Sequence, residues 1–302
     1  MALKMVLWLL AAAVALLIGA YLYLQEYDSL AAVVERSYVE LSAWPKCKAW
    51  SHDAPMATKG LTFFSQQVQD WAVFMVAVVD ADHPGTYIDL ASNHYSFDSN
   101  TFFFDRCLRW RGVCVEPNPR YHSGLRQGRS CDLVPTCIAS EDGTHANFEG
   151  SDQSAHATPA NTTSGNVWPH LRCTSLATIL RARNISHVNY LSLDVEGYEL
   201  NALHGIDWEA VRFDIMTVER AEGPVRNFLA SKGYEAAFCA SLDTVFIRSG
   251  DAALKGRARK FLDLSSGNGA ARECIQPAGT TCQKVWEACL DWRRRGRPMD
   301  WG

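Results

Sequence analysis

The sequence predicts an α/β fold with a mostly parallel sheet, preceded by one transmembrane helix. Between residues 83 and 250, short apolar runs typical of β-strands alternate with segments of helical periodicity, which favours parallel strands joined by crossover helices. The last two β-like runs, Tyr234–Cys239 and Thr244–Arg248, are joined by a link too short for a helix. We therefore expect them to pair as an antiparallel hairpin.

Residues 5–24 form a run without a charged side chain, which predicts the membrane helix. A helix of about 20 residues matches a hydrocarbon core of roughly 30 Å. Two rival interpretations are a cleaved signal peptide, whose apolar region is usually shorter, and a buried core helix. Lys4 before the run and acidic residues after it place residues 1–4 in the cytosol. We expect a single-pass type II membrane protein, with its bulk in the ER or Golgi lumen or at the cell surface.

Ten cysteines are consistent with that location, because lumenal proteins form disulfides. Buried free thiols are the competing interpretation for Cys107, Cys114 and Cys137, which fall in apolar elements. Asn161 and Asn184 each begin a glycosylation sequon. The formal net charge of −4 leaves no basic excess, so we expect no nucleic-acid partner. No ligand spacing demands a metal, and nothing indicates the oligomeric state.

The chain divides into further regions by composition. Residues 25–82 form a stem that ends in a helix predicted within residues 61–80. Residues 83–250 form the main domain, in which the polar segment 150–169 is predicted as a loop. Residues 251–302 form a C-terminal extension that contains three cysteines.

The main domain is expected to contain five strands before the hairpin, with helices between and after them. The strands are Thr86–Ala91, Val113–Glu116, Leu133–Ala139, Val188–Val195 and Phe213–Val218, and the helices are Ser99–Arg111, Arg120–Gln127, Thr174–Arg183, Glu199–His204 and Val225–Lys232.

Polar residues follow the first two strands, where open α/β sheets bind their ligands. Ala91 is small and Asn93 tolerates a left-handed backbone, so a ligand can approach this loop closely. Asn100 lies where the next helix begins, and free N–H groups there can bind a carboxylate. Glu116 ends the second strand, where an acidic residue can accept both hydroxyl groups of a ribose.

Carboxyl groups also follow the fourth and fifth strands. Asp194 and Glu196 follow the fourth strand, and Glu219 ends the fifth. Because the carboxyl ends of parallel strands meet at one edge of the sheet, we expect these acids to crowd together, raise one pKa and supply a general base. His94 and His204 are weaker candidates, since a lone histidine is more often a surface or core residue.

The segments YIDLASN, SNTFFFDRCLRWRGVCVEPNP, LSLDVEGYELNALHGIDW and DTVFIRS together resemble the FkbM family of methyltransferases. The resemblance covers residues 86–249, and the pairing of VEPNP with LDVEGYE at this separation is specific. It implies the Rossmann-like fold of class I methyltransferases, with parallel strands and one antiparallel C-terminal strand. It also implies an O-methyltransferase that uses S-adenosylmethionine and acts on a hydroxyl group, here expected on a glycan or a lipid.

The resemblance also implies roles for individual residues. Asp89, Ala91 and Asn93 would line the methionine end of the cofactor, with Asn100 close by. Glu116 would hold the ribose, and Ser140 would lie near the adenine. Asp194 would lie beside the transferred methyl group, as cofactor ligand and first candidate for the catalytic base. Glu196 would support it as the second catalytic candidate.

One departure from the family pattern lies in the first loop. The family commonly has Gly-Ala-Asn-x-Gly where this sequence has Ala91-Ser92-Asn93-His94-Tyr95, and the Tyr95 ring is expected to crowd the cofactor. An alternative is therefore a non-catalytic membrane protein of the Star type, which binds or escorts a client protein. A dehydrogenase is disfavoured, because the sequence lacks a Gly-x-Gly-x-x-Gly fingerprint.

Overall fold

A computed structural model describes residues 63–77, 84–149, 156–159, 167–266 and 269–295. All of them belong to one compact unit, Lys46–Gly302. The predicted membrane span 5–24 and the sequon at Asn161 lie outside the described residues. Within the described ranges, no helix is long and apolar enough to cross a membrane.

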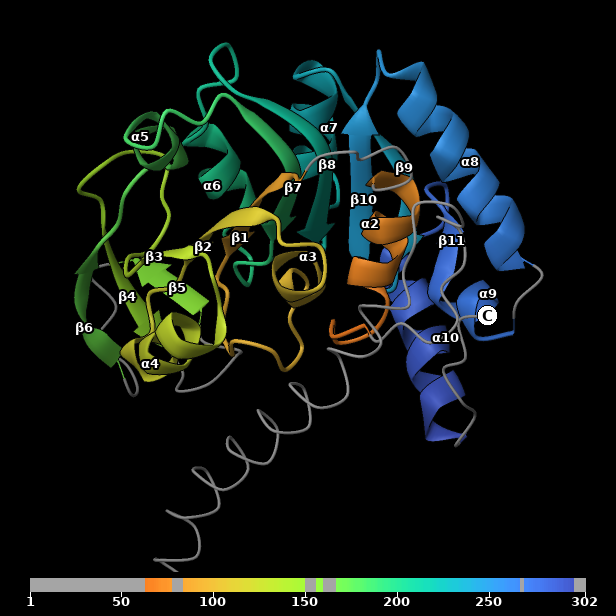
Figure 1. The fold of residues 1–302 in the computed structure, drawn as a ribbon, viewed down its shortest axis with the longest axis horizontal. Helices are drawn as coiled ribbons and strands as arrows, with labels where there is room; N and C mark the ends of the chain where they lie inside the picture. The colour runs from red at the N-terminus through yellow and green to blue at the C-terminus, as the bar shows by residue number, and fades with distance from the viewer. Residues whose placement is uncertain (1–62, 78–83, 150–155, 160–166, 267–268, 296–302) are drawn as a thin grey trace, which may run out of the picture. The chain divides into compact units, whose positions relative to one another are not determined.

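A large mixed sheet forms the centre of this unit (Figure 1), and its eight strands lie in the order β11-β9-β10-β8-β7-β1-β2-β3. Their bounds are β1 Thr86–Leu90, β2 Arg111–Val115, β3 Asp132–Val134, β7 His187–Leu193, β8 Arg212–Glu219, β9 Tyr234–Ala240, β10 Asp243–Arg248 and β11 Ile275–Pro277. The strands β3, β2, β1, β7 and β8 run parallel to one another. This mostly parallel sheet is the one predicted, and it fits the Rossmann-like methyltransferase fold.

The helices connect and cover these strands. Their bounds are α2 Gln69–Ala77, α3 Phe102–Arg106, α4 Pro119–Gly128, α5 Leu176–Arg181, α6 Glu199–His204, α7 Pro224–Ser231, α8 Ala252–Ser266, α9 Gly269–Cys274 and α10 Cys282–Arg294. The helix α3 is shorter than predicted, because the backbone of Arg109 takes a positive φ of 56° and β2 already begins at Arg111.

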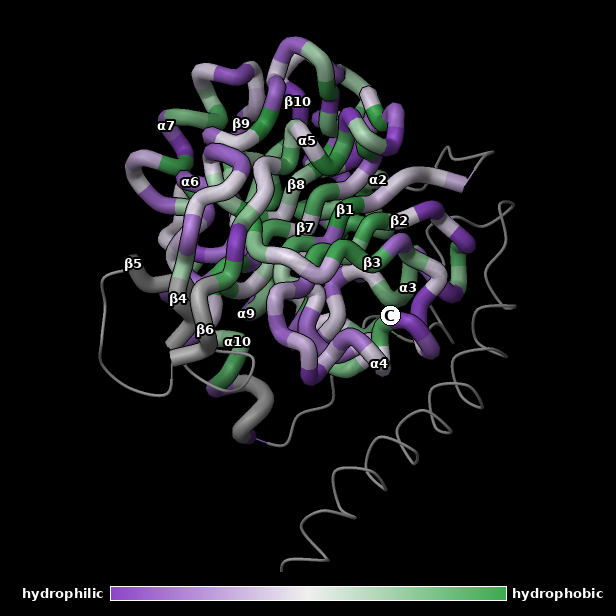
Figure 2. Tube along the Cα trace, turned by 90° about the vertical axis from the view of Figure 1, so that its left-hand side faces the viewer, coloured by the Kyte–Doolittle hydropathy of each residue, from purple (hydrophilic) through white to green (hydrophobic). Residues whose placement is uncertain are grey.

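Alternating side chains of the central strands pack on opposite faces, as the period of a β-strand requires. Leu191 and Leu193 of β7 join the apolar cluster that contains buried residues of α5, α6 and α7. Tyr190, the residue before Leu191, faces the other way and contacts Phe104 of α3, with 5.2 Å between ring centroids. The most apolar stretches of the chain accordingly run along the central strands (Figure 2). This buried core holds the strand ends at fixed positions.

The C-terminal part of the sheet differs in detail from the expectation. The hairpin of β9 and β10 is confirmed, with antiparallel pairing. The antiparallel strand β10 lies between β8 and β9, and β11 adds an unpredicted edge strand that pairs antiparallel with β9. Residues of the predicted C-terminal extension therefore belong to the central sheet.

Two predictions for the middle of the domain were wrong. The segment 150–169 was predicted as a loop, but β4 (His145–Glu149), β5 (His156–Pro159) and β6 (Val167–Arg172) form a second, three-stranded sheet. The third strand of the main sheet was predicted to reach Ala139, but it ends at Val134, because Pro135 has no N–H group for the ladder.

Disulfides cross-link the described part of the chain. Four pairs are formed, Cys114–Cys131, Cys137–Cys173, Cys239–Cys282 and Cys274–Cys289. The competing interpretation of free thiols was therefore wrong for Cys114 and Cys137. Two of the four bonds involve the C-terminal segment and tie α10 to β9 and to the end of α9.

Candidate active site

A cleft of about 830 Å³, including its open mouth, lies at the carboxyl ends of the parallel strands. The cleft is lined by Gln66, Gln69, Asp89, Leu90, Ala91, Ser92, Asn93, Asp98, Ser99, Asn100, Ser192, Asp194, Glu196, Glu219, Arg220, Leu242 and Trp286. Six of the predicted site residues are among them, namely Asp89, Ala91, Asn93, Asn100, Asp194 and Glu196.

The loop after β1 forms one wall of the cleft. Ala91 and Asn93 take positive φ angles of 57° and 50°, a conformation that glycine adopts more readily than alanine. Ser92 holds this turn in two ways, since its hydroxyl donates to Asp89 O at 2.9 Å and its N–H donates to Val115 O at 3.2 Å. The loop therefore follows a glycine-like path without glycine, which the sequence pattern alone did not predict.

Glu116 lies beneath this loop rather than on the open surface of the cleft, with 2% of its surface exposed. Its Oε2 accepts the N–H of Asn93 at 2.8 Å and its Oε1 accepts the N–H of Asn118 at 2.6 Å. Burial raises the pKa of Glu116 to about 7, although both N–H groups act in the opposite direction. Each carboxylate oxygen keeps a second lone pair for a further hydrogen bond.

The Tyr95 ring does not line the cleft. It is buried against α4, where Gly128 leaves no room for even a methyl group beside the ring and Gly124 is also close. A Cβ atom at Gly124 would lie 3.2 Å from Tyr95 Cδ1. The expected crowding of the cofactor by Tyr95 was thus wrong, because two glycines of the following helix make space for the ring.

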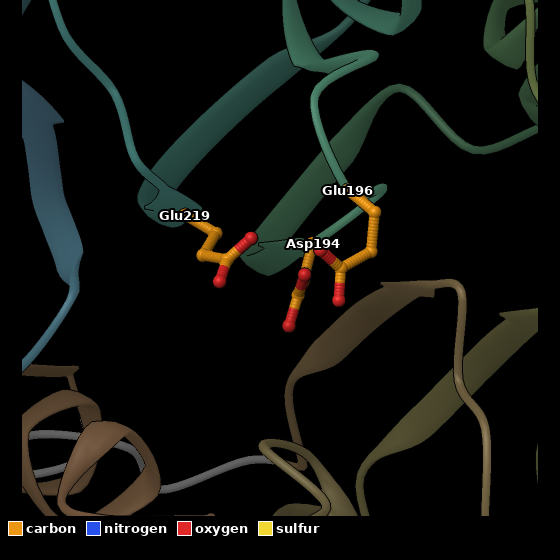
Figure 3. Close-up of side chains that lie close together, drawn as sticks. All are labelled: Asp194, Glu196 and Glu219. Atoms are coloured by element: carbon orange, nitrogen blue, oxygen red, sulfur yellow. The ribbon is translucent and has the colours of Figure 1, made fainter. Parts of the chain in front are cut away.

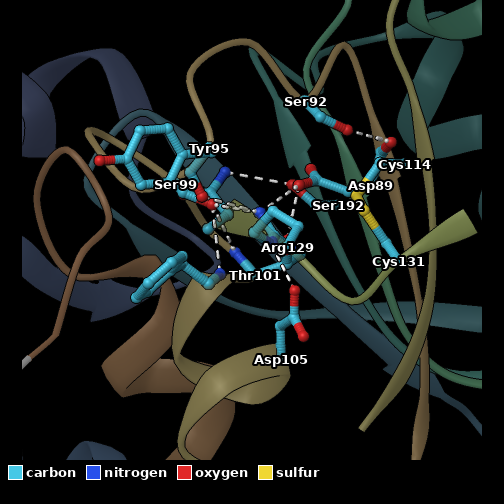
Figure 4. A network of polar contacts seen from close by, with 12 residues as sticks. Asp89, Ser92, Tyr95, Ser99, Thr101, Asp105, Cys114, Arg129, Cys131 and Ser192 are labelled. Carbon is cyan, nitrogen blue, oxygen red and sulfur yellow. Dashed lines mark hydrogen bonds and ion pairs between the residues drawn. A yellow bond between two sulfur atoms is a disulfide. The ribbon is translucent and has the colours of Figure 1, made fainter. Parts of the chain in front are cut away.

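A buried network of charged and polar side chains packs against the loop after β1 (Figure 4). Arg129 is fully buried, and its Nε donates to Asp105 Oδ2 at 2.6 Å. Its Nη1 lies 3.7 Å from Asp89 Oδ2, and its Nη2 donates to Thr101 Oγ1 at 2.6 Å. Thr101 in turn donates to Asp89 at 2.5 Å. Burial raises the pKa of Asp89, whereas Arg129 acts to lower it.

Sequence reasoning missed Arg129 and Asp105. They lie far from Asp89 along the chain, and no short motif connects them. The network fixes the carboxyl group of Asp89 and the loop after it, since Arg129 Nη1 also donates to the Tyr95 carbonyl at 3.3 Å.

Three carboxyl groups converge on the other side of the cleft (Figure 3). Asp194 follows β7, Glu219 ends β8, and Glu196 lies on the loop after β7 at a positive φ of 52°. Arg220, which sequence reasoning also missed, places its Nη1 at 3.1 Å from both Glu196 Oε2 and Glu219 Oε2. The predicted crowding of these acids is confirmed in its geometry.

Burial changes the protonation of this cluster. It raises the pKa of Asp194 to about 6, and the negative charge of Glu196 adds to this effect. The pKa of Glu219 is raised further, first by burial and then by the charge of Asp194. Asp194 and Glu219 therefore hold one proton between them near neutral pH, as adjacent carboxyl groups commonly do. Such a pair can take up or release a proton in the physiological range.

The same three acids are arranged so that they could hold a cation. One oxygen from each of Asp194, Glu196 and Glu219 lies within 4.8 Å of the others. Hard divalent cations prefer such oxygen ligands. In this structure Arg220 supplies the positive charge that neutralises part of the cluster.

The remaining candidates lie away from the cleft. Ser140 does not line it, and its N–H donates to Asn201 Oδ1 at 2.8 Å. His94 accepts the Phe97 N–H at 3.0 Å through Nδ1, and burial lowers its pKa to about 4. His204 is exposed and contacts Phe228 with its ring tilted by 59°, at 4.6 Å between ring centroids. The adenine role of Ser140 stays a prediction.

The model of the methyltransferase FkbM domain matches residues 83–236, about half of the chain. The chain belongs to the FkbM methyltransferase family. The match includes the loop after β1, Glu116 and the three acids, so the candidate site lies within the family domain. Methyltransferases of this family generally use S-adenosylmethionine. No curated protein and no solved structure matches the chain.

Proposed function

We propose that this FkbM family member is a membrane-anchored O-methyltransferase that uses S-adenosylmethionine and acts on a glycan or lipid hydroxyl group. One observation carries the proposal. Asp194 and Glu219, from two neighbouring strands, lie close together in the lining of a cleft at the carboxyl edge of the sheet, where burial raises the pKa of both carboxyl groups. Transfer of a methyl group to a hydroxyl requires a group that accepts the hydroxyl proton, and this pair supplies it.

The charge of the cleft fits the cofactor. Its lining has five carboxyl groups and one guanidinium group, and S-adenosylmethionine carries a net positive charge. A second fit is found next to Glu116, where the buried Asn118 Nδ2 has no hydrogen-bond partner among the described residues. A buried donor without a partner is costly, and a bound ligand can satisfy it.

Side chains at the ends of β1 and β2 would hold the cofactor. Glu116 would accept ribose hydroxyl groups through its remaining lone pairs, and Asn118 would donate from the same strand end. The loop from Asp89 to Asn93 and the Asn100 amide would border the methionine end. Asn100 Nδ2 donates to Ser192 Oγ at 3.1 Å, which fixes its orientation in the cleft.

The bound cofactor supplies a methyl group already activated by a sulfonium centre. The protein must then align the acceptor hydroxyl and remove its proton. Asp194 accepts that proton at a carboxylate oxygen, because its pKa of about 6 keeps it largely ionised at neutral pH. Glu219 keeps the shared proton, and Arg220 holds Glu196 and Glu219 in place.

Several features of the chain support the proposed location. Residues 5–24 would anchor it in the membrane, with the described unit in the ER or Golgi lumen or at the cell surface. Four disulfides support an oxidising compartment. Asn184, which begins a sequon, is exposed and open to glycosylation.

The direct test is methyl transfer by the full-length chain, purified in detergent, from labelled S-adenosylmethionine to pools of glycans and lipids. The expected result is incorporation that requires the wild-type Asp194 and is lost in Asp194→Asn. Folded protein that binds the cofactor but labels neither pool would contradict the proposal.

A non-catalytic, client-binding protein of the Star type is the second candidate. The observation that favours it is that both carboxylate oxygens of Glu116 already accept backbone N–H groups. In that case Glu116 only closes the loop after β1. Folded protein that fails to bind S-adenosylmethionine but co-purifies with one client would support this second function.

A further inference from the structure

One wall of the cleft comes from outside the family domain. Gln66 and Gln69 precede the matched residues 83–236, and Leu242 and Trp286 follow them. Gln69 lies in α2, Leu242 in the turn between β9 and β10, and Trp286 in α10. The family domain supplies the loop after β1 and the three acids. Segments outside the matched residues therefore contribute to the lining of the cleft.

The helix that carries Trp286 is firmly attached to the domain. Cys282, at its first residue, is bonded to Cys239 of β9, and Cys289 is bonded to Cys274. Arg226 of α7 adds a polar link, because its Nη1 donates to Ala278 O at 3.1 Å. Its Nε donates to Ala221 O at 2.7 Å, two residues after Glu219. These bonds therefore fix the helix that carries Trp286 relative to the rest of the domain, which includes the acidic residues of the cleft.

The chemistry of this wall indicates what it would recognise. Trp286 is partly exposed and offers a large, rigid apolar ring surface. The lining of the same cleft also contains amide and carboxyl groups, including Gln66 and Glu196. A flat aromatic surface beside hydrogen-bonding groups suits a sugar ring, which has an apolar C–H face and polar hydroxyl groups at its edge.

The charge of the cleft further restricts the kind of acceptor that it can bind. Asp89, Asp98, Asp194, Glu196 and Glu219 face it, against Arg220 alone on the positive side. Arg220 is already paired with two of these acids. A sulfated, phosphorylated or sialylated group would meet like charges, which is unfavourable at close range. The cleft is therefore suited to an uncharged acceptor.

We propose that Trp286 is a specificity-determining residue for the acceptor, and that it stacks on the apolar face of an uncharged sugar residue of a glycan. This inference rests on the proposed methyltransferase function, because it assigns the acceptor side of the same cleft. It makes the C-terminal helix part of the acceptor site, and it selects the glycan over the lipid as substrate class.

The test measures acceptor binding and methyl transfer separately on the full-length chain. The probes are oligosaccharides that end in neutral mannose, galactose, fucose or N-acetylglucosamine, with sialylated and sulfated counterparts, all presented with S-adenosylhomocysteine. The variants are Trp286→Ala and Trp286→Phe, with Lys284→Ala as the control. Lys284 is an exposed residue of the same helix, so its variant reports any general damage to α10.

The expected result is binding of neutral glycans that Trp286→Ala weakens by about tenfold or more, as truncation of an aromatic anchor usually does. Trp286→Phe should keep part of the affinity, and Lys284→Ala should keep all of it. Affinity for S-adenosylhomocysteine should be the same in every variant. Because a general loss of folding would lower this affinity, the measurement shows that the variants are folded.

Glycan binding through Trp286 without methyl transfer would refute the proposed function but support this inference. Methyl transfer to a glycan with an unchanged KM in Trp286→Ala would support the proposed function but refute this inference. Preference for sialylated or sulfated glycans, or binding of no glycan by protein that binds the cofactor product, would overturn the inference.

Discussion

Asn93 donates its backbone N–H to Glu116 Oε2 at 2.8 Å, so the carboxyl group that ends β2 holds the loop that ends β1. The two residues are 23 positions apart in sequence but adjacent at the carboxyl edge of the sheet. This contact stabilises a left-handed turn that lacks the glycines common in the family. It also links Glu116 with the loop after β1, the two parts of the proposed cofactor site.

Substitution of Gly128 tests the explanation of how Tyr95 is accommodated. In Gly128→Ala the new methyl group would overlap the Tyr95 ring, so overpacking should lower the free energy of unfolding by about 1–3 kcal/mol. The measurement is the midpoint of thermal or denaturant unfolding. Gly256→Ala is the matched control, since this helical glycine has open space around it and should gain about 0.5–1 kcal/mol.

A double variant completes this test. If the clash with Tyr95 causes the loss, adding Tyr95→Ala to Gly128→Ala should cost less than the sum of the two single substitutions. Strict additivity of the two effects would show that Gly128 and Tyr95 do not interact and that another feature keeps the ring out of the cleft.

Removal of the buried guanidinium group should strongly destabilise the domain. Arg129→Met leaves Asp105 and Asp89 without their cation, and breaking a buried pair in this way costs about 3–5 kcal/mol. The comparison is Arg183→Met, because Arg183 pairs with Asp132 in a largely exposed setting that contributes at most about 1 kcal/mol. Equal unfolding midpoints for the two variants would rule out a structural role for the buried network.

Asp194 should set the acid limb of the pH profile. It acts as a base only when ionised, and its pKa is raised to about 6 by burial and by Glu196. Methyl transfer at saturating acceptor should therefore rise with pH through about 6 and level off above it. The positive charge of bound S-adenosylmethionine favours the ionised carboxylate and shifts this limb to lower pH. Activity that stays constant down to pH 4.5 would exclude Asp194 as the base.

The two acids after β7 should differ in their effect on catalysis. Asp194→Asn should lower kcat by about 10²-fold or more, as loss of a general base usually does. Glu196→Gln should have a smaller effect, since Glu196 is paired with Arg220 and lies on the more open side of the cluster. Equal losses of kcat in the two variants would show that the assignment of the base is wrong.

The main sheet could be predicted because its strands are buried on both faces and stand out as apolar runs. The run from Val188 to Val195 predicted β7 within two residues at either end, and the rule that parallel strands share a carboxyl edge brought Asp194 and Glu219 together. The smaller sheet was missed, because β5 and β6 lie in a polar segment whose composition is typical of loops.

Contacts between distant residues could not be predicted from one sequence. Arg129 follows α4 and looks like an ordinary surface residue after a helix, yet it is fully buried beside Asp105, which is 24 positions away. The position of Tyr95 depended on two glycines of the following helix. Trp286 lies outside the family domain, so no motif placed it in the cleft.

Binding of S-adenosylmethionine to the full-length chain tests the central claim most directly. A ligand that binds only the folded state must raise the melting temperature. We predict a saturable shift with S-adenosylmethionine and with S-adenosylhomocysteine. It should be lost in Glu116→Ala and retained in Glu141→Ala, which removes an exposed carboxyl group. The absence of a shift at millimolar ligand, in wild-type protein shown to be folded, would contradict the account and favour the client-binding function.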